Sequence, residues 1–243
     1  MQRYFIKLAY NGKPFNGWQI QPNAPTVQEE IETALFTVLR EKINVVGCGR
    51  TDTGVHASEF FAHFETDISF ELDQFAFKLN CIIPFEISIY DIWKVAPDFH
   101  ARFTATARTY HYYINQIKDP FDFDKSWYMH QDLDMDQMNN ACKHLMGTQD
   151  FTSFSKLHTQ TRTNNCTITK AKWERVEGKL RFTITADRFL HNMVRAIVGT
   201  SVNVGKGKIT PSDFKEIILA KSRQKAGASV PAQGLFLAKV DYP

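Results

Sequence analysis

The sequence contains few cysteines, and they form no pattern. Cys48, Cys81, Cys142 and Cys166 include no C-x-x-C pair and no regular spacing, so the sequence predicts neither a disulfide framework nor a zinc site. The eight histidines likewise form no H-E-x-x-H motif or similar ligand set. We therefore expect buried free thiols and no metal site.

Long hydrophobic runs are also lacking. The most apolar windows, such as FLHNMVRAIVG at 189–199, are interrupted by charged or polar residues, far short of the roughly 20 apolar residues that span a bilayer. The N-terminal stretch MQRYFIKLAY has no apolar core of a signal peptide and alternates like a strand. We expect a cytoplasmic protein that does not associate with membranes.

No strong excess of one charge is present, because 29 Lys and Arg residues against 26 Asp and Glu residues give a net charge of +3. This balance permits nucleic-acid binding without requiring it. Arginines do lie close to aromatic residues in HARFTATARTYHYY (100–113) and ADRFLHNMVR (186–195), a mixture that suits phosphate contacts and base stacking. Arginines that cover the rim of a core would give the same composition.

Residue patterns predict the elements of the first half. Alternation predicts a strand at 3–10. Thr26 followed by Glu29 predicts a capping box before a helix at 31–41. The remaining predicted elements of this half are strands at 43–48, 57–67 and 87–95 and a helix at 72–82.

The second half repeats this order, with a hairpin predicted to turn at Glu177 and Gly178. Its other predicted elements are strands at 107–117 and 234–242, helices at 134–147 and 190–202, and an additional helix that starts at Thr210 and Pro211. Two β-α-β-β-α-β series predict an α+β fold of two ferredoxin-like halves, 1–101 and 102–243. We expect their sheets to join into one extended mixed or antiparallel sheet, with helices on one face and a basic RNA-binding cleft between the halves.

The glycine-rich stretch GRTDTGVHA at 49–57 carries one carboxylate, Asp52. In an extended segment the side chain of Arg50, two residues earlier, points the same way. Such a pair favours the ionised carboxylate, which suits a nucleophile or a base. The same residues would also be explained if Asp52 only capped a turn and the glycines only shaped a hairpin.

GRTDTGVHA resembles the catalytic-aspartate motif of the TruA family of tRNA pseudouridine synthases. Four more segments resemble family motifs in the same order: YNGKPFNGWQIQPNAPTVQEEIETAL, DFHARFTATARTYHYYI, GTQDFTSFSK and FLHNMVRAIVGT. The C-terminal ASVPAQGLFL is similar to the family's A-P-x-x-G-L ending and departs from it at Ser229 and Val230. The resemblance spans about the whole chain.

The resemblance implies the isomerisation of uridine to pseudouridine in the anticodon stem-loop of tRNA, at tRNA positions 38, 39 and 40. The base is detached from N1, turned in the site and rejoined through C5. No cofactor takes part. The resemblance further implies a homodimer in which one tRNA contacts both subunits.

The resemblance also implies roles for single residues. Asp52 is the catalytic carboxylate, and its attack on the sugar, its addition to the base and proton removal through a glycal all remain open. Tyr110 would stack on the uracil, and its hydroxyl could transfer a proton. Arg195 would pair with the aspartate and hold its charge.

The resemblance places further candidates at the RNA. Arg50 would enter the RNA stack as the base leaves it, and Leu190 would pack against the target base, although core packing explains Leu190 equally well. His191 is predicted to share a helix face with Arg195. The central motif supplies three candidates for backbone contacts: His100, Arg102 and Arg108. A structural role is equally compatible with His100.

Two other functions fit parts of the sequence. A catalytically silent RNA-binding module explains the basic and aromatic segments but gives no reason for Asp52. A hydrolase that cleaves glycosidic bonds explains Asp52 but needs a second carboxylate, for which Glu59 is the nearest candidate in the sequence.

Overall fold

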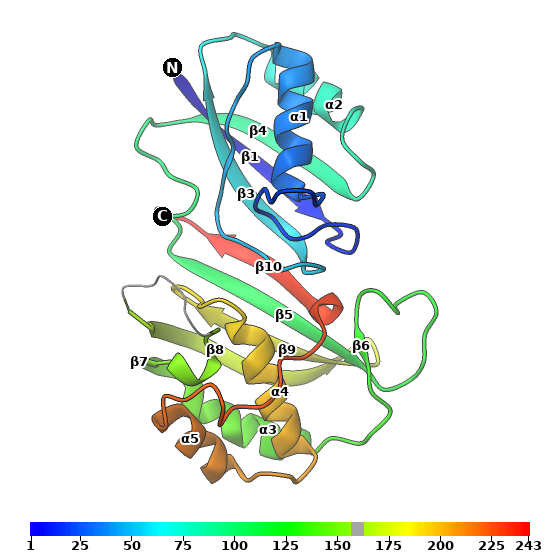
Figure 1. Ribbon diagram of the computed structural model, residues 1–243, viewed down its shortest axis with the longest axis vertical. Coiled ribbons are helices and arrows are strands. Elements are labelled where there is room, and N and C mark those ends of the chain that lie inside the picture. Colours follow the sequence, from blue (N-terminus) through cyan, green and yellow to red (C-terminus); the bar gives the residue numbers. More distant parts are fainter. Residues whose placement is uncertain (157–162) are drawn as a thin grey trace. The chain divides into compact units, whose positions relative to one another are not determined.

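The computed structural model describes residues 1–156 and 163–243, and the described chain divides into two compact units (Figure 1). Unit 1 comprises Met1–Thr106 and Phe236–Pro243, and unit 2 comprises Ala107–Leu235. The halves expected above, 1–101 and 102–243, place the last strand with the second half. In the structure most of that strand belongs to unit 1, because Phe236 and Leu237 pair in parallel with His56 and Ala57.

Unit 1 is built on a mostly antiparallel sheet. Its elements are β1 (Gln2–Tyr10), α1 (Val27–Leu39), β2 (Val46–Gly47), β3 (His56–Thr66), α2 (Leu72–Asn80), β4 (Ile87–Val95) and β10 (Leu235–Asp241). The strands follow the order β4-β1-β3-β10, and β2 pairs with β3. Strand β1 is antiparallel to both neighbours. All elements predicted for this region are present, although the strand predicted at 43–48 is reduced to β2.

Alternation along β1 gives unit 1 apolar packing on both faces of its sheet. On the face toward α2, Tyr4 contacts Phe70, whose ring stacks on Phe75. On the opposite face, Phe5 lies among rings from other parts of unit 1, which are Phe61, His63, Trp93, Phe99 and Tyr242. The segment that follows β4 carries Phe99, and it therefore covers the sheet face opposite α2.

Helix α1 begins one residue after Thr26, but the predicted capping box is wrong. Thr26 makes no side-chain cap bond, and its buried hydroxyl has no hydrogen-bond partner within the described ranges. Instead, the amides of Val27 and Gln28 donate to the carbonyl oxygens of Gly17 (3.2 Å) and Trp18 (3.0 Å). A backbone loop thus satisfies the first amides of the helix, so no capping side chain is needed.

Unit 2 contains an antiparallel series of strands and three α-helices among its described residues. Its elements are β5 (Ala107–Asn115), β6 (Trp127–Tyr128), α3 (Met135–Cys142), β7 (Gly147–Asp150), β8 (Asn165–Val176), β9 (Lys179–Ala186), α4 (Met193–Gly205) and α5 (Pro211–Leu219). The strands follow the order β5-β9-β8-β7, and each pair is antiparallel. The short β6 pairs in parallel with β5. Each unit therefore has the α+β character predicted from the sequence.

Two turn predictions for unit 2 are confirmed. Glu177 (φ 51°) and Gly178 (φ 80°) join β8 to β9, which is the pair of positive φ angles of a tight hairpin turn. At α5, the hydroxyl of Thr210 accepts from the amide of Asp213, whose carboxylate accepts from the Thr210 amide, and Pro211 opens the helix.

The start predicted for α4 is wrong. The helix was expected at 190–202, but Asn192 lies at the N-cap in the left-handed region (φ 65°) and α4 begins at Met193. Leu190 and His191 therefore precede the helix. The predicted helix face shared by His191 and Arg195 does not exist.

Three further expectations concern the cysteines, metal ligands and membrane-spanning helices. All four cysteines are free thiols, of which Cys81 is exposed, so the expectation of burial is wrong at that position. Within the described part of the chain, no three His, Cys, Asp or Glu side chains are placed to hold a metal ion. Likewise, no helix among the described residues is long and apolar enough to cross a bilayer.

Candidate active site

Asp52 lies in unit 1, on the loop between β2 and β3, and its side chain is half-buried. Its carbonyl oxygen accepts a hydrogen bond from the amide of Val55 at 3.1 Å, and Gly54 between them has a positive φ of 74°. These features form a tight turn that only glycine adopts without strain at position 54. Asp52 is therefore the first residue of this turn, and β3 begins directly after the turn ends at Val55.

A second loop, residues 12–18, fastens this turn through backbone atoms. The amide of Trp18 donates to the Thr51 carbonyl (3.3 Å), and the amide of Gly54 donates to the Phe15 carbonyl (3.2 Å). We call loop 12–18 the clamp loop. Because it also supplies the carbonyl oxygens that cap α1, the position of Asp52 is coupled to the start of that helix.

Two glycines make the clamp loop possible. A Cβ atom on Gly17, whose φ is +87°, would lie 2.3 Å from the carbonyl oxygen of Thr51. A Cβ atom on Gly12 would lie 1.9 Å from the carbonyl oxygen of Val55. Both distances are far inside van der Waals contact, so only glycine permits this approach. No role was predicted for Gly12 and Gly17, although both lie in the segment YNGKPFNGW that resembles a family motif.

His56 closes the other end of the loop. Its Nδ1 accepts from the amide of Gly12 at 3.1 Å, and its ring stacks on Phe236 at 4.5 Å with an interplanar angle of 18°. A ring nitrogen that accepts a hydrogen bond carries no proton. His56 was not predicted as a functional residue, and its place at the end of GRTDTGVHA was the available signal.

The predicted RNA-binding residues of unit 1 differ in their surroundings. Arg50 is exposed on the loop that carries Asp52. Arg102 is exposed and lies over the ring of Phe103 at 5.6 Å. Both arginines are therefore accessible to a polyanion.

His100 has a structural role. Its Nδ1 accepts from the amides of Arg102 (3.1 Å) and Phe103 (3.3 Å), and its ring meets His63 at 4.7 Å. Burial, followed by the positive charge of Arg3, lowers the pKa of His100. The neutral ring holds the turn that carries Arg102, which favours the structural alternative for this residue.

Tyr110 lies in unit 2, on β5, where it is half-buried. The rings of Tyr110 and Phe189 pack edge to face, with their centroids 5.1 Å apart and an interplanar angle of 84°. Alternation along the strand places Tyr110 on the same face as the buried Tyr112. Phe189 was not predicted, although it directly precedes Leu190 in the quoted motif.

Arg195 lies in the first turn of α4 and is held by one residue at two points. Its Nε donates to the carbonyl oxygen of Val230 at 2.7 Å, and the amide of Val230 donates to the Arg195 carbonyl at 3.3 Å. This pair of bonds fixes both the backbone and the guanidinium plane. Val230 was noted in the sequence only as a departure from the family ending.

The segment around Val230, residues 227–231, is itself held by side chains, and we call it the latch. Arg223 donates to the Gly227 carbonyl and to the Ser229 hydroxyl, each at 3.0 Å. Asn192 also donates to the Ser229 hydroxyl. A Cβ atom on Gly199 of α4 would lie 1.9 Å from the Ala228 carbonyl oxygen, so the latch lies directly against the helix.

Tyr112 connects the latch to β5. Its hydroxyl donates to the carbonyl oxygen of Pro231 at 2.9 Å. Burial raises the pKa of this hydroxyl, and the positive charge of Arg195 opposes that rise. Tyr112 and Arg195 are thus close enough to interact electrostatically, and the strand that bears Tyr110 is tied to the segment that holds Arg195.

The other candidates of unit 2 have mixed surroundings. Arg108 donates to the Asp187 carbonyl at 3.0 Å on an exposed part of the sheet. Leu190 is buried, with 5% of its surface exposed, which favours core packing over contact with a base. His191 is exposed, and its carbonyl accepts from the Lys156 amide at 3.1 Å.

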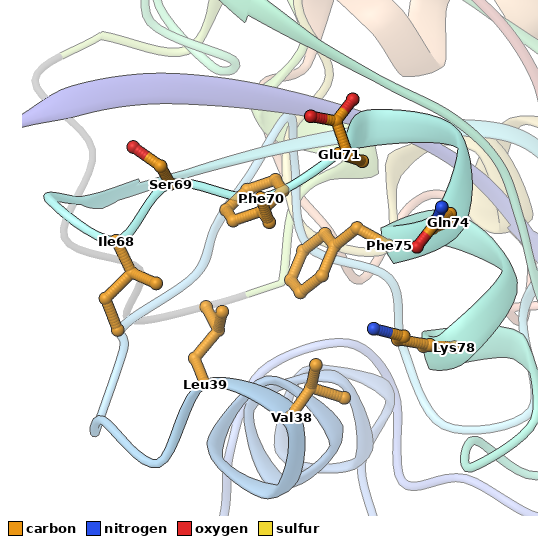
Figure 2. A pocket seen from close by; sticks show the side chains of 9 residues that line it. All are labelled: Val38, Leu39, Ile68, Ser69, Phe70, Glu71, Gln74, Phe75 and Lys78. Atoms are coloured by element: carbon orange, nitrogen blue, oxygen red, sulfur yellow. The ribbon is translucent and has the colours of Figure 1, made fainter.

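A pocket of about 280 Å³ lies elsewhere on unit 1, beside α1 and α2 (Figure 2). Its apolar lining consists of Val38, Leu39, Ile68, Phe70 and Phe75, and its polar lining of Ser69, Glu71, Gln74 and Lys78. None of the candidate residues described above lines it. We assign it no part in the chemistry.

Comparison with known proteins identifies the family. A family model described as tRNA pseudouridine synthase matches residues 141–243. The chain is 52% identical over 244 residues to tRNA pseudouridine synthase A of Parabacteroides distasonis, which covers 100% of this chain and 97% of that protein. The protein of the same name from Bacteroides thetaiotaomicron is 51% identical over 246 residues (100% and 91% covered), and that from Clostridium acetobutylicum is 41% identical over 245 residues (100% of both). With such identity over its full length, the chain belongs to the tRNA pseudouridine synthase A family.

Proposed function

We propose that this protein isomerises uridine to pseudouridine in the anticodon stem-loop of tRNA, at tRNA positions 38, 39 and 40, with Asp52 as the catalytic carboxylate. The observation that carries this proposal is the support of the Asp52 turn by the clamp loop. Backbone bonds and glycine contacts hold the residue before Asp52 and the residues after it. Such preorganisation is what a catalytic side chain requires.

The reaction breaks the bond between N1 and C1′ and forms a bond between C5 and C1′. The C5 proton leaves to solvent and N1 gains a proton, so no oxidant or group donor is needed. Asp52 acts beside the glycosidic bond, as a nucleophile or as a base. All three routes left open by the sequence require the carboxylate in its ionised form.

The target base must leave its stack, which costs a few kcal/mol. We assign the compensating contact to the ring of Tyr110, since stacking on an aromatic side chain contributes about 1–3 kcal/mol per base. Phe189 holds this ring from the side. Arg195 supplies positive charge to the reaction, with its guanidinium plane fixed by Val230.

Contacts with the tRNA backbone are assigned to exposed basic residues. Arg50 and Arg102 of unit 1 and Arg108 and His191 of unit 2 have accessible positions. The half-buried His100 supports the turn that carries Arg102, and the buried Leu190 is assigned to core packing. We expect recognition by RNA shape, since few of these side chains are suited to reading a base.

The two rival functions lack support from the structure. The hydrolase needs a second carboxylate, but Glu59 accepts from Lys7 Nζ at 2.9 Å through one oxygen and from the Val240 amide at 3.1 Å through the other. Glu59 is therefore engaged within the sheet. A silent RNA-binding module would have no use for a clamped aspartate.

Three finer expectations belong to the same proposal. Each half is ferredoxin-like, which in unit 1 is supported by the antiparallel order β4-β1-β3 with β2 on β3. The protein acts as a cytoplasmic homodimer that shares one tRNA between two subunits. Light scattering of the purified protein, alone and with tRNA, tests the dimer.

The proposed function is tested by tritium release. Purified protein is incubated, without metal or cofactor, with an unmodified tRNA transcript that carries tritium at C5 of uridine. Wild-type protein should release tritium to water, and Asp52→Asn should reduce the rate at least about 10³-fold, because it removes the charge while keeping the shape.

Binding controls complete this experiment. Asp52→Asn should retain its tRNA affinity within a few fold, since the substitution leaves the exposed arginines in place. Near-wild-type release by Asp52→Asn would refute the catalytic assignment. Free uracil among the products would support the hydrolase, and binding without release by the wild-type protein would support the silent module.

A further inference from the structure

The hydroxyl of Tyr10 forms a buried hydrogen bond with the residue that precedes Asp52. Tyr10 is the last residue of β1, and its Oη lies 2.9 Å from Oγ1 of Thr51. Both side chains are buried, with 5% and 9% of their surfaces exposed. The Tyr10 ring is fixed in turn by the rings of Trp18 (6.4 Å) and Phe60 (5.5 Å).

Two groups of Thr51, the side-chain hydroxyl and the backbone carbonyl, are therefore held by hydrogen bonds. Its side chain is bonded to Tyr10, and its carbonyl oxygen accepts from the Trp18 amide. The peptide bond from Thr51 to Asp52 is planar. Fixing the Thr51 carbonyl oxygen thus fixes the plane that contains the amide nitrogen and the Cα atom of Asp52.

We infer that Tyr10 and Thr51 are positioning residues for Asp52. Their hydroxyl pair sets the backbone from which the carboxylate projects, and neither side chain contacts the substrate. This inference rests on the proposed catalytic role of Asp52. It extends the clamp loop, which acts through backbone atoms, by one bond between side chains.

A positioning role and a purely structural role differ in what they change. Loss of one hydrogen bond lowers the stability by a modest amount in either role. A displacement of about 1 Å at a catalytic group can reduce the rate about 10²-fold. A positioning bond therefore affects kcat far more than its effect on stability predicts, while KM for tRNA stays constant.

The test is a double-mutant cycle with Tyr10→Phe and Thr51→Val. Each substitution removes one hydroxyl and keeps the size of the side chain. Each should lower kcat about 10–100-fold, with KM for tRNA within about twofold of wild type. The double variant should be no slower than the slower single variant, because either change already removes the shared bond.

Two further variants separate positioning from general damage. Thr51→Ser retains the hydroxyl and should keep kcat within about threefold of wild type. Tyr242→Phe is the matched control, since the Tyr242 hydroxyl donates to the Ala101 carbonyl at 2.7 Å in the same unit but outside the loop. It should lower the melting temperature about as much as Tyr10→Phe does and leave kcat unchanged.

The outcomes distinguish this inference from the proposed function. Wild-type kcat in Tyr10→Phe, together with inactive Asp52→Asn, would overturn the positioning role and leave the function intact. Additive losses in the double variant, or a slow Thr51→Ser, would also overturn it. An active Asp52→Asn would remove the catalytic assignment itself and the positioning role with it.

Discussion

Asp52 in unit 1 and Arg195 in unit 2 are both supported by irregular segments, but by different kinds of contact. The Asp52 turn is held by the clamp loop, through backbone amides, backbone carbonyl oxygens and two glycines that leave room for close approach. Arg195 lies in a helix, and the latch that holds it is fastened by the side chains of Arg223 and Asn192.

The difference follows from the elements involved. A loop has no regular hydrogen-bond pattern of its own, so another backbone segment must supply partners for its amide and carbonyl groups. A helix already satisfies most of these groups, so a support is needed only for the side chain. Substitutions that add a Cβ atom at Gly12 or Gly17 should therefore disrupt the support of Asp52, and substitutions that remove a side-chain donor should weaken the support of Arg195.

Among substitutions in the two supports, the largest effect is expected from Gly17→Ala. The new Cβ atom would meet the Thr51 carbonyl oxygen at 2.3 Å, and alanine is strained at φ +87°. The clamp loop must shift away from the Asp52 turn, so kcat for tritium release should fall about 100-fold. Single-turnover rates with saturating enzyme measure this fall.

Gly49→Ala is the matched control in the same region. A Cβ atom on Gly49 meets nothing within 4 Å. Its kcat should stay within about twofold of wild type. Equal losses in the two variants would show that glycine content matters only for flexibility, and the clamp would have no special role.

A smaller effect is expected from Arg195→Lys in unit 2. Lysine keeps the charge but lacks the Nε that donates to Val230, so the cation loses its fixed direction. We expect about a tenfold lower kcat with little change in KM. Arg175→Lys, which loses a 3.1 Å bond to the Gln116 amide oxygen on another part of unit 2, is the control. A wild-type rate for Arg195→Lys would show that the bond to Val230 is dispensable.

The smallest effect is on stability, and it concerns one histidine in each unit, the buried His63 and the half-buried His111. Burial, followed by the charges of His100 and Arg3, lowers the pKa of His63 to about 4. Burial, followed by the charge of Arg181, lowers the pKa of His111 to about 4. Both groups bind protons more readily in the unfolded chain, whose histidine pKa is 6.5.

The sign of the pH effect follows from that difference. Between pH 6.5 and about 4 the unfolded state binds more protons, so the stability contributed by these histidines is fully present above pH 6.5 and is lost as the pH falls toward 4. The melting temperature should fall by a few degrees across this range. His63→Asn and His111→Asn, which keep a polar group that does not titrate, should each flatten the fall, and the exposed His130→Asn should not. If the melting temperature of His63→Asn and of His111→Asn fell with pH as steeply as that of the wild type, this account would be contradicted.

Some features of the fold could be predicted because they depend on neighbours in the sequence. The hairpin at Glu177 and Gly178 and the helix start at Thr210 and Pro211 need only residues within three positions of one another. The same reasoning failed at Thr26, where the carbonyl oxygens of a loop took the place of the capping side chain. It also failed at Asn192, whose left-handed conformation ends the apolar pattern before the helix begins.

The candidate residues themselves could be named from the sequence, because motifs record residue types and their order. Their supports could not. Gly12, Gly17 and Tyr10 lie more than 30 positions from the loop that they hold, and Val230 lies 35 positions from Arg195. No period or spacing in a single sequence reports such pairs.

The sequence by itself determined the family, the order of most helices and strands, and the chemical groups available for the reaction. These features are local, since each depends on side-chain type and on the conformations that a few adjacent residues prefer. Only the tertiary structure decided which segments hold Asp52 and Arg195, that Leu190 is buried, and that the half-buried His100 accepts hydrogen bonds from a neighbouring turn. Those choices depend on close approach and on hydrogen bonds between distant segments, and both exist only after the chain has packed.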